Sequence, residues 1–267
     1  MKKKEGRGPG NENKPKRLIQ SIKRSSDILE LFLKEKKPLG ITEFSQRLSL
    51  SKNTIQSIVN TLVGLNYLER DRNTKKYRLG PMLFRLGIVY AESIDFINQS
   101  RVWLERLCYK FNIPVNVGIL SYDKVIVLAR IEPAMGFFMA SSRTGSFMPA
   151  LNSSLGKMLY AFMDKQKLQE IIDSLKLESY TDKSITSPKA FMKELEQIRK
   201  DMVSFDNEEL LKGTACIAGP IFNQNREILA AFSVAGEADV IYKNKKSIID
   251  EIKYTSMEIS KMFGYEA

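Results

Sequence analysis

Residues 51–64 read Ser-Lys-Asn-Thr-Ile-Gln-Ser-Ile-Val-Asn-Thr-Leu-Val-Gly and indicate an amphipathic helix. Ser51 is a suitable N-cap, because its hydroxyl can accept a hydrogen bond from the free N–H groups of the first turn. Apolar side chains recur with the i, i+3, i+4, i+7 spacing of one helix face, namely Ile55, Ile58, Val59 and Leu62. Uncharged polar side chains repeat that spacing on the opposite face, namely Asn53, Gln56, Ser57 and Asn60. Amides can pair with adenine in a DNA major groove, so this face is either a base-reading surface or an ordinary solvated one.

The segments on both sides of this helix complete a winged helix-turn-helix pattern. Residues 41–48 predict a short helix, and residues 49–51 form a link of the length that joins two such helices. Residues 65–70 and 77–79 predict a hairpin with a charged turn. In this plan the second helix enters the major groove, and the hairpin, or wing, contacts phosphate or the minor groove. The residues expected to contact DNA are Arg24, Ser51, Lys52, Asn53, Thr54, Gln56, Ser57, Asn60, Arg72, Lys75 and Lys76.

The net charge of +11 is confined to the same part of the chain. Residues 1–80 contain 19 Lys and Arg against 8 Asp and Glu, whereas residues 81–267 contain 23 of each kind. An excess confined to one unit is typical of a protein that binds a polyanion. Duplex DNA is the expected polyanion because of the helix-turn-helix pattern. RNA and an anionic membrane surface are alternatives for residues 1–17, which we expect to be a disordered basic tail because they cannot form an apolar face.

The composition excludes several classes of protein. The sequence contains no run of roughly 18 apolar residues, so it predicts no membrane span. The Lys-rich N-terminus lacks the apolar segment of a secretory signal. Two cysteines do not make a disulfide framework, so we expect a reduced, cytoplasmic protein. Histidine is absent, which excludes imidazole-based catalysis and His-ligated zinc. We therefore expect no metal, no cofactor and no enzymatic activity.

The chain divides into four expected parts. After the tail come a DNA-binding domain at 18–80, a linker helix at 81–96 and a second domain at 97–267. Pro81 favours a helix start, because proline is tolerated at the first helical position. The linker helix is rich in apolar residues, and the simplest way to bury it is against a copy of itself. This predicts a homodimer.

Apolar spacing predicts the elements within both domains. The first helix is expected at 20–35, with Ile22, Leu29, Phe32 and Leu33 facing the core. In the second domain, strands are expected at 115–120, 124–130, 137–140, 216–222 and 228–234, and helices at 97–111, 155–162, 165–175, 189–201 and 245–263. The predicted fold class of the second domain is α+β, an antiparallel sheet flanked by helices.

The sequence resembles the IclR family of bacterial transcriptional regulators over residues 18–265. The segments that carry the resemblance are 24–33, 50–54, 65–71, 77–80, Arg143-Thr144-Gly145, Pro149 with 155–157, 206–209, Gly213 with 216–221, and 230–234. The resemblance implies a GAF-like effector-binding domain, dimers or dimers of dimers (a homotetramer), and control of catabolic genes by a small metabolite.

The resemblance also implies a ligand pocket. The positions of the family's pocket correspond here to the backbone amides of Leu155 and Gly156 and to the side chains of Asp206, Cys216 and Ser233. Amides at the start of a helix are a ready site for a carboxylate, which supports the backbone part independently. Without the resemblance, the three side chains read as a surface carboxylate, a small buried hydrophobe and a strand hydroxyl.

Three positions depart from the family pattern. Leu151 stands where the family often has histidine, and Ala235 where it often has a second small hydroxyl. Both changes predict a more apolar pocket and an effector that is larger or less polar than a two- or three-carbon keto acid. Ser57 stands where many members have arginine, so base readout is expected to depend on Asn53, Gln56 and Asn60 instead.

Together these patterns predict a DNA-binding repressor of catabolic genes, controlled by an organic-acid or sugar-derived effector. One alternative is a metabolite-sensing or enzymatic domain with an ancillary basic head. The chain shows no nucleophile–base pairing that would supply the acid–base chemistry of an enzyme. A second alternative is an RNA-binding winged helix.

Overall fold

The structure, a computed structural model, describes residues 18–93, 95–133, 142–174 and 177–266. The chain forms two compact units, Met1–Ile94 and Asp95–Ala267, and each is described by itself. The expected basic tail at 1–17 and the expected strand at 137–140 lie outside the described residues. No helix of the described residues is long and apolar enough to cross a lipid bilayer.

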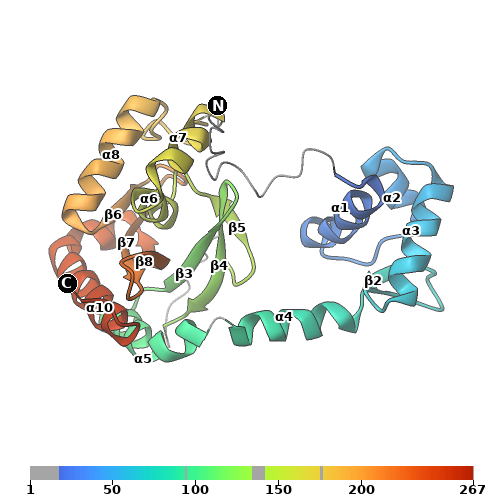
Figure 1. The fold of residues 1–267 in the computed structure, drawn as a ribbon, viewed down its shortest axis with the longest axis horizontal. Helices are drawn as coiled ribbons and strands as arrows, with labels where there is room; N and C mark the ends of the chain where they lie inside the picture. The colour runs from blue at the N-terminus through green and yellow to red at the C-terminus, as the bar shows by residue number, and fades with distance from the viewer. Residues whose placement is uncertain (1–17, 94, 134–141, 175–176, 267) are drawn as a thin grey trace, which may run out of the picture. The chain divides into compact units, whose positions relative to one another are not determined.

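The first unit is a winged helix-turn-helix followed by one further helix (Figure 1). Its elements are α1 (Gln20–Glu35), α2 (Ile41–Leu48), α3 (Lys52–Gly64), β1 (Leu68–Arg70), β2 (Tyr77–Leu79) and α4 (Pro81–Ser93). Backbone hydrogen bonds between Leu39 and Tyr77, of 3.0 and 2.8 Å, attach the segment before α2 to the wing. Gly80 ends the wing, and a Cβ there would lie 2.3 Å from the Asn66 carbonyl oxygen, so only glycine fits.

The core of the first unit lies where α1, α2 and α3 meet the wing. Its buried side chains are Ile28, Leu31, Phe32, Leu39, Phe44, Ile55, Val59, Leu62, Leu68 and Tyr77. The apolar stripe predicted on α3 is confirmed, with Ile58 only partly buried. The assignment for α1 is wrong at Ile22 and Leu33, which are exposed. The helices dock on the face of α1 that carries Ile28 and Leu31, one position away from the predicted stripe.

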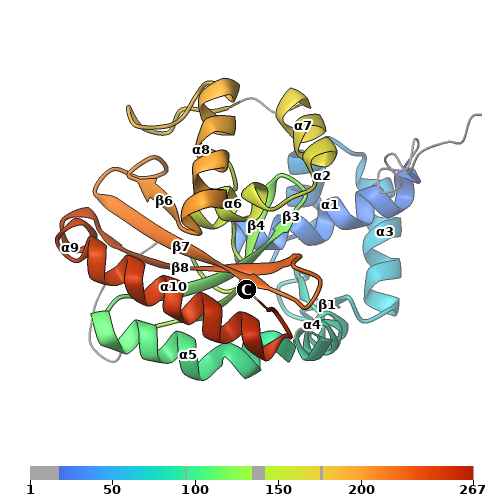
Figure 2. The same cartoon turned by 60° about the vertical axis from the view of Figure 1, so that its left-hand side comes forward.

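The second unit is a six-stranded antiparallel sheet in the order β5-β4-β3-β8-β7-β6. Helices cover it on both sides, which confirms the predicted α+β class (Figure 2). Its elements are α5 (Asp95–Phe111), β3 (Val115–Ser121), β4 (Lys124–Ile131), β5 (Phe147–Pro149), α6 (Ser154–Ala161), α7 (Lys165–Ser174), α8 (Pro188–Asp201), β6 (Ser204–Asn207), β7 (Thr214–Phe222), β8 (Ile228–Glu237), α9 (Ala238–Lys243) and α10 (Lys245–Met262).

The two faces of this sheet bury different clusters. Alternate strand residues such as Val115, Val117 and Ile217 pack against α5 and α10. The other face packs against α6, behind which α8 lies. That face also carries polar side chains, including Asn116 and Ser233, within otherwise apolar strands. The functional site of the second unit is built on this polar face.

Candidate functional site

The polar face of α3 is held in a defined geometry. Asn53, Ser57 and Asn60 are exposed, and Gln56 is half-buried. The Gln56 Nε2 donates to Asn60 Oδ1 at 2.7 Å and also lies 3.4 Å from the Tyr77 hydroxyl. Because both bonds use the Gln56 nitrogen, they leave the Gln56 carbonyl oxygen as an acceptor and the Asn60 amide nitrogen as a donor. This acceptor and donor form one fixed pair on the surface of the helix.

The other residues predicted at the helix start serve the helix itself. The Ser51 Oγ accepts from the Thr54 amide at 3.2 Å and lies 2.9 Å from the Thr54 Oγ1. Capping of this kind sets where α3 begins and therefore which side chains its first turn presents. Lys52 is exposed, while Arg24 on α1 is half-buried. A cap of this type leaves Ser51 and Thr54 little freedom to act as base readers.

The wing turn is organised by Asp71. Its Oδ1 accepts from the amides of Asn73 and Thr74, at 2.9 and 2.7 Å, and from the Thr74 hydroxyl. The Thr74 amide bond is the main cause that holds the pKa of Asp71 below its usual value. Arg72 and Lys75 are exposed beside this turn. The turn therefore holds two cations in a fixed loop that can meet phosphate.

Lys76 differs from the other two wing cations. Its Nζ lies 3.1 Å from Glu43 Oε2, and the same carboxylate oxygen accepts from the Gly40 amide at the start of α2. That amide bond is the first cause, and Lys76 the second, that lowers the pKa of Glu43. Lys76 thus links the wing to α2, and a phosphate would have to compete with Glu43 for it.

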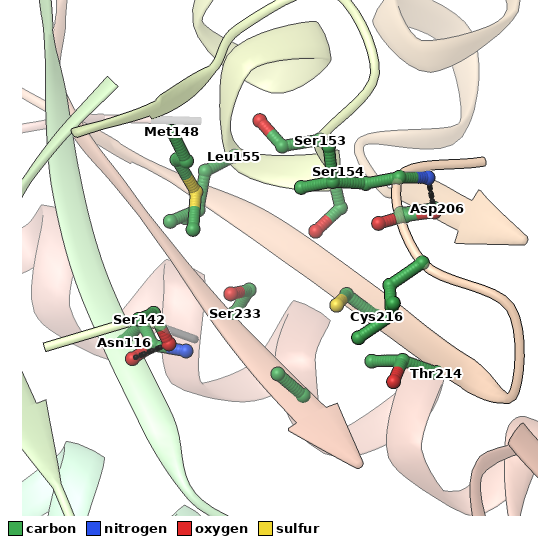
Figure 3. A pocket seen from close by; sticks show the side chains of 13 residues that line it. Asn116, Ser142, Met148, Ser153, Ser154, Leu155, Asp206, Thr214, Cys216 and Ser233 are labelled. Carbon is green, nitrogen blue, oxygen red and sulfur yellow. Dashed lines mark hydrogen bonds between the residues drawn. The ribbon is translucent and has the colours of Figure 1, made fainter. Parts of the chain in front are cut away.

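A cavity lies in the second unit between α6 and the sheet (Figure 3). Its volume is about 490 Å³, which includes space open to solvent. The wall combines hydroxyl, amide and carboxyl groups with a few apolar side chains. The residues that line it are Asn116, Ser142, Met148, Ser153, Ser154, Leu155, Asp206, Leu210, Leu211, Thr214, Cys216, Ser233 and Ala235.

Asp206 is the main titratable group of the wall. Its Oδ1 accepts from the amides of Glu209 and Leu210, at 2.7 and 3.4 Å. Burial raises the pKa of Asp206 to about 7, against the lowering effect of the Glu209 amide. Burial also raises the pKa of the Cys216 thiol well above its usual value. Cys216 is therefore a neutral thiol at neutral pH and not an activated nucleophile.

A buried lysine lies behind the cavity. Lys157 on α6 is 0% exposed, and its Nζ lies 2.6 Å from Glu209 Oε1 and 3.4 Å from Glu194 Oε1. Glu209 is itself buried and follows Asp206 by three residues. The ion pair therefore attaches α6 to the segment that carries Asp206, and it positions one wall of the cavity against another.

Comparison with known proteins identifies both units. Residues 21–72 match the model described as the IclR helix-turn-helix domain. Residues 88–261 match the model described as bacterial transcriptional regulator IclR C-terminal. The chain belongs to the IclR family. It is therefore a DNA-binding transcriptional regulator with a C-terminal effector domain, and this family is not enzymatic.

Individual relatives of this IclR-family regulator cover most of the chain. The regulator BhcR of Paracoccus denitrificans is 33% identical over 82% of this chain and 77% of its own length. The regulator XynR of Escherichia coli is 28% identical over 94% of this chain and 99% of its own length. A crystal structure of an IclR homologue from Microbacterium hydrocarbonoxydans, complexed with 4-hydroxybenzoate, superposes with a TM-score of 0.79 at 20% identity, covering 90% of this chain and 98% of that one.

Some, but not all, of the residues expected to form the IclR-family pocket line the cavity. The structure brings Leu155, Asp206, Cys216, Ser233 and Ala235 together around it. Two other expected residues, Leu151 and Gly156, are not among its lining residues.

The reasons for these two differences are local. Leu151 is buried in the apolar cluster on the α6 side of the sheet. A Cβ on Gly156 would lie 2.0 Å from the Ala150 carbonyl oxygen, so the glycine allows close packing of backbone. The Gly156 amide also donates to the α6 cap, Ser153 Oγ, at 3.1 Å. The amides of the first turn that precede it, those of Ser154 and Leu155, are the ones left for a ligand.

Several lining residues of this IclR-family cavity were not predicted, namely Asn116, Ser142, Met148, Ser153, Ser154, Leu210, Leu211 and Thr214. One signal was present for Asn116, because an amide within the apolar run Val115-Asn116-Val117 is unusual in a buried strand. Thr214 shares the face of Cys216 by strand alternation. The wall combines these polar groups with apolar side chains, and the more apolar pocket expected from Leu151 and Ala235 stays a prediction.

Proposed function

We propose that this regulator is a repressor of catabolic genes that binds its operator as a homodimer. The α3 face reads bases, Arg72 and Lys75 contact phosphate, and a small carboxylic acid in the α6 cavity changes operator affinity. The observation that carries the proposal is the fixed Gln56–Asn60 pair on the exposed face of a helix-turn-helix. The Gln56 oxygen and the Asn60 nitrogen match the donor and acceptor that adenine presents in the major groove. The relative IclR of Escherichia coli is a transcriptional repressor, which supports the direction of regulation.

Replacing Gln56 or Asn60 by alanine is expected to remove base readout. The loss on the operator should be about 1–3 kcal/mol, with little change on random duplex. Titration of both duplexes by fluorescence anisotropy at several salt concentrations measures this. Lys75→Ala is the matched control, because an exposed wing cation should weaken both duplexes equally and reduce the salt dependence. Equal losses on operator and random DNA for Gln56→Ala would reject readout by this helix.

The homodimer is proposed from the surface of α4. Phe84 is 71% exposed and Val89 64% exposed, and Leu86 and Ile88 are exposed as well. A helix that is apolar around most of its circumference is normally buried, and a two-fold copy is the simplest cover.

The double change Phe84→Glu, Val89→Glu is therefore expected to give a monomer in sedimentation velocity. Operator affinity should then fall at least tenfold, because each monomer reaches only one half-site. Arg85→Glu on the same helix is the control and should remain a dimer. A double variant that sediments as the parent protein does would place the interface elsewhere.

The carboxylate class of the effector is proposed from Asp206 and the start of α6. With its pKa near 7, Asp206 is largely neutral below that pH and can donate to a bound carboxylate. Ionisation above pH 7 places two anions together, so ligand binding is linked to uptake of a proton. The 4-hydroxybenzoate complex of the Microbacterium hydrocarbonoxydans homologue supports an acid as the ligand class.

Affinity for a carboxylate effector is accordingly expected to fall as pH rises from about 6 to about 8, by up to tenfold per unit. Calorimetric titration across this range measures the dependence. Asp206→Asn keeps an oxygen for the Glu209 and Leu210 amides but cannot ionise, so its pH dependence should be flat. The same slope in both proteins would exclude Asp206 as the linked group.

A further inference from the structure

The α6-facing side of the sheet carries polar side chains on five strands. In register, Arg130 on β4 pairs with Asn116 on β3, and Asn116 pairs with Ser233 on β8. On the next two strands, Cys216 on β7 pairs with Asp206 on β6. Ser233 is connected to Cys216 through the apolar Ala235, which shares the face of Ser233 and pairs with Cys216. The cavity therefore has two polar ends, one at Asn116 and one at Asp206.

The orientation of the Asn116 amide is set by its neighbours. Arg130 Nη1 donates to Asn116 Oδ1 at 3.1 Å and to Ser142 Oγ at 2.8 Å, and Ser142 Oγ lies 3.2 Å from the same Oδ1. A guanidinium has donors only, so the atom of Asn116 that faces it must be the oxygen. The Asn116 side chain thus has its Nδ2 on the other side, toward Ser233, as Figure 3 shows.

This end of the cavity is buried and has an unused donor. Asn116 is 2% exposed, and the Arg130 side chain is 7% exposed and ion-paired with Glu132. No hydrogen bond from Asn116 Nδ2 to another described residue is present. This nitrogen is not among the fully buried polar atoms that lack a partner, and Asn116 lines the cavity, so the donor is accessible from the cavity. An amide N–H that opens into a cavity can donate to an oxygen that a ligand or a water supplies. The nearby guanidinium favours an oxygen that carries negative charge.

The register also sets the length of a ligand that reaches both ends. Asn116 and Asp206 stand on strands separated by three strand spacings, β3 to β8 to β7 to β6. At about 4.8 Å each, these amount to roughly 14 Å across the strands. The two-residue step from Ser233 to Ala235 adds about 7 Å along the strands, which gives roughly 16 Å between backbones. Subtracting a hydrogen-bond length of about 2.9 Å at each end leaves roughly 10 Å for the ligand. With C–C bonds of about 1.5 Å, a two- or three-carbon acid spans roughly half of that distance.

We propose that Asn116, held by Arg130 and Ser142, is a second specificity-determining residue, and that the effector is an elongated acid with a polar group at each end. Five to seven carbons in a chain, or one ring substituted at opposite ends, fit this spacing. One end is a carboxylate or a carbonyl group, whose oxygen accepts hydrogen bonds from the Asn116 amide. The other end lies at Asp206 and the start of α6, and Met148 and Leu155 contact the apolar middle. This inference rests on the carboxylate effector proposed above and adds its length and its second contact.

The test compares ligand length in the full-length parent protein and in Asn116→Asp. Asparagine to aspartate keeps the shape and the acceptor for Arg130, but it removes the amide donors and adds an anion. The probes are pyruvate, glutarate, adipate, pimelate and 4-hydroxybenzoate, with thermal shift as the first readout and calorimetry for the affinities. We expect the longer acids to bind the parent protein at least tenfold more tightly than pyruvate. Asn116→Asp should weaken them at least tenfold and change pyruvate less than twofold.

Two further variants separate recognition from folding. Ser142→Ala removes one anchor of the Asn116 amide without adding charge, and a smaller loss, about threefold, is expected for the longer acids alone. Asn152→Asp is the matched control, because Asn152 is also 2% exposed but is not a lining residue of the cavity. It should leave the length preference unchanged. If Asn116→Asp does not fold, Ser142→Ala decides the question by the same comparison.

The outcomes distinguish this inference from the proposed function. Selective loss of the longer acids in Asn116→Asp or Ser142→Ala supports it. Acids that bind the parent protein but are insensitive to both variants, or a preference for pyruvate, overturn it and leave the carboxylate effector in place. If none of the acids binds the parent protein, the carboxylate class itself is wrong, and the role of Asn116 fails with it.

Discussion

Lys157→Met is expected to destabilise the second unit by about 3–5 kcal/mol. The parent ammonium is fully buried and lies 2.6 Å from Glu209 Oε1. Removing one partner of a buried ion pair leaves the other as an uncompensated charge, which costs far more than the pair contributed. Glu209 Oε2 already has no hydrogen-bond partner among the described residues, and the Asn207 amide, at 3.5 Å from Oε1, is a weak replacement for the lysine.

Denaturant unfolding followed by tryptophan fluorescence measures this loss. Trp103 is the single tryptophan of the chain and lies on α5, so the signal reports on the second unit. Lys193→Met, at an exposed position of α8, is the control and should change stability by less than about 0.5 kcal/mol. The double variant Lys157→Met, Glu209→Gln should recover part of the loss, because no charge is then left unpaired. A loss below about 1 kcal/mol in the single variant would contradict the proposed cost of the unpaired carboxylate.

Phe44→Ala is expected to unfold the first unit selectively, with a cost of about 3–5 kcal/mol. Phe44 is fully buried, contacts the Phe32 ring edge-on at a centroid distance of 5.7 Å and lies 6.4 Å from the Tyr77 ring. These contacts join α1, α2 and the wing through one side chain. A cavity at this point removes a large part of a small core, and the free energy of unfolding of a small unit is low.

The measurement combines DNA binding with the unfolding signal of Trp103. Phe44→Ala should lose operator and random DNA binding together, while the Trp103 transition and effector binding stay as in the parent protein. Leu33→Ala is the control, because Leu33 is a large apolar residue of α1 that lies outside the core. It should retain DNA binding. Loss of the Trp103 transition in Phe44→Ala would show instead that the two units unfold together.

Local patterns were sufficient to locate the helices and the wing of the DNA-binding unit. Helix α3 was predictable because its apolar stripe and its Ser51 cap are both contained in one short segment. The longer strands β7 and β8 were predictable for a similar reason, since continuous apolar runs are typical of buried strands. The confinement of positive charge to residues 1–80 pointed to a polyanion before any fold was known.

Short or context-dependent elements were not predictable. Strands β5 and β6, of 3 and 4 residues, and the six-residue helix α9 were missed. Such segments are too short to show a period, and β5 and β6 are strands only because a neighbouring strand pairs with each of them. The error at Ile22 and Leu33 has a related cause. An apolar stripe on a helix identifies a face, but the helices that dock on it decide which residues are covered.

The chain's amino acids alone therefore determine that it has a basic helix-turn-helix head and an electrically neutral α+β domain, because each rests on periodicity or charge within one segment. They do not determine the effector site. Asn116, Asp206 and Ser233 come from distant parts of the chain and share one wall only through strand register. Register is set by long-range pairing and burial across the whole sheet. The orientation of Asn116 depends further on Arg130 and Ser142, so only the tertiary structure decided which polar groups a ligand would meet.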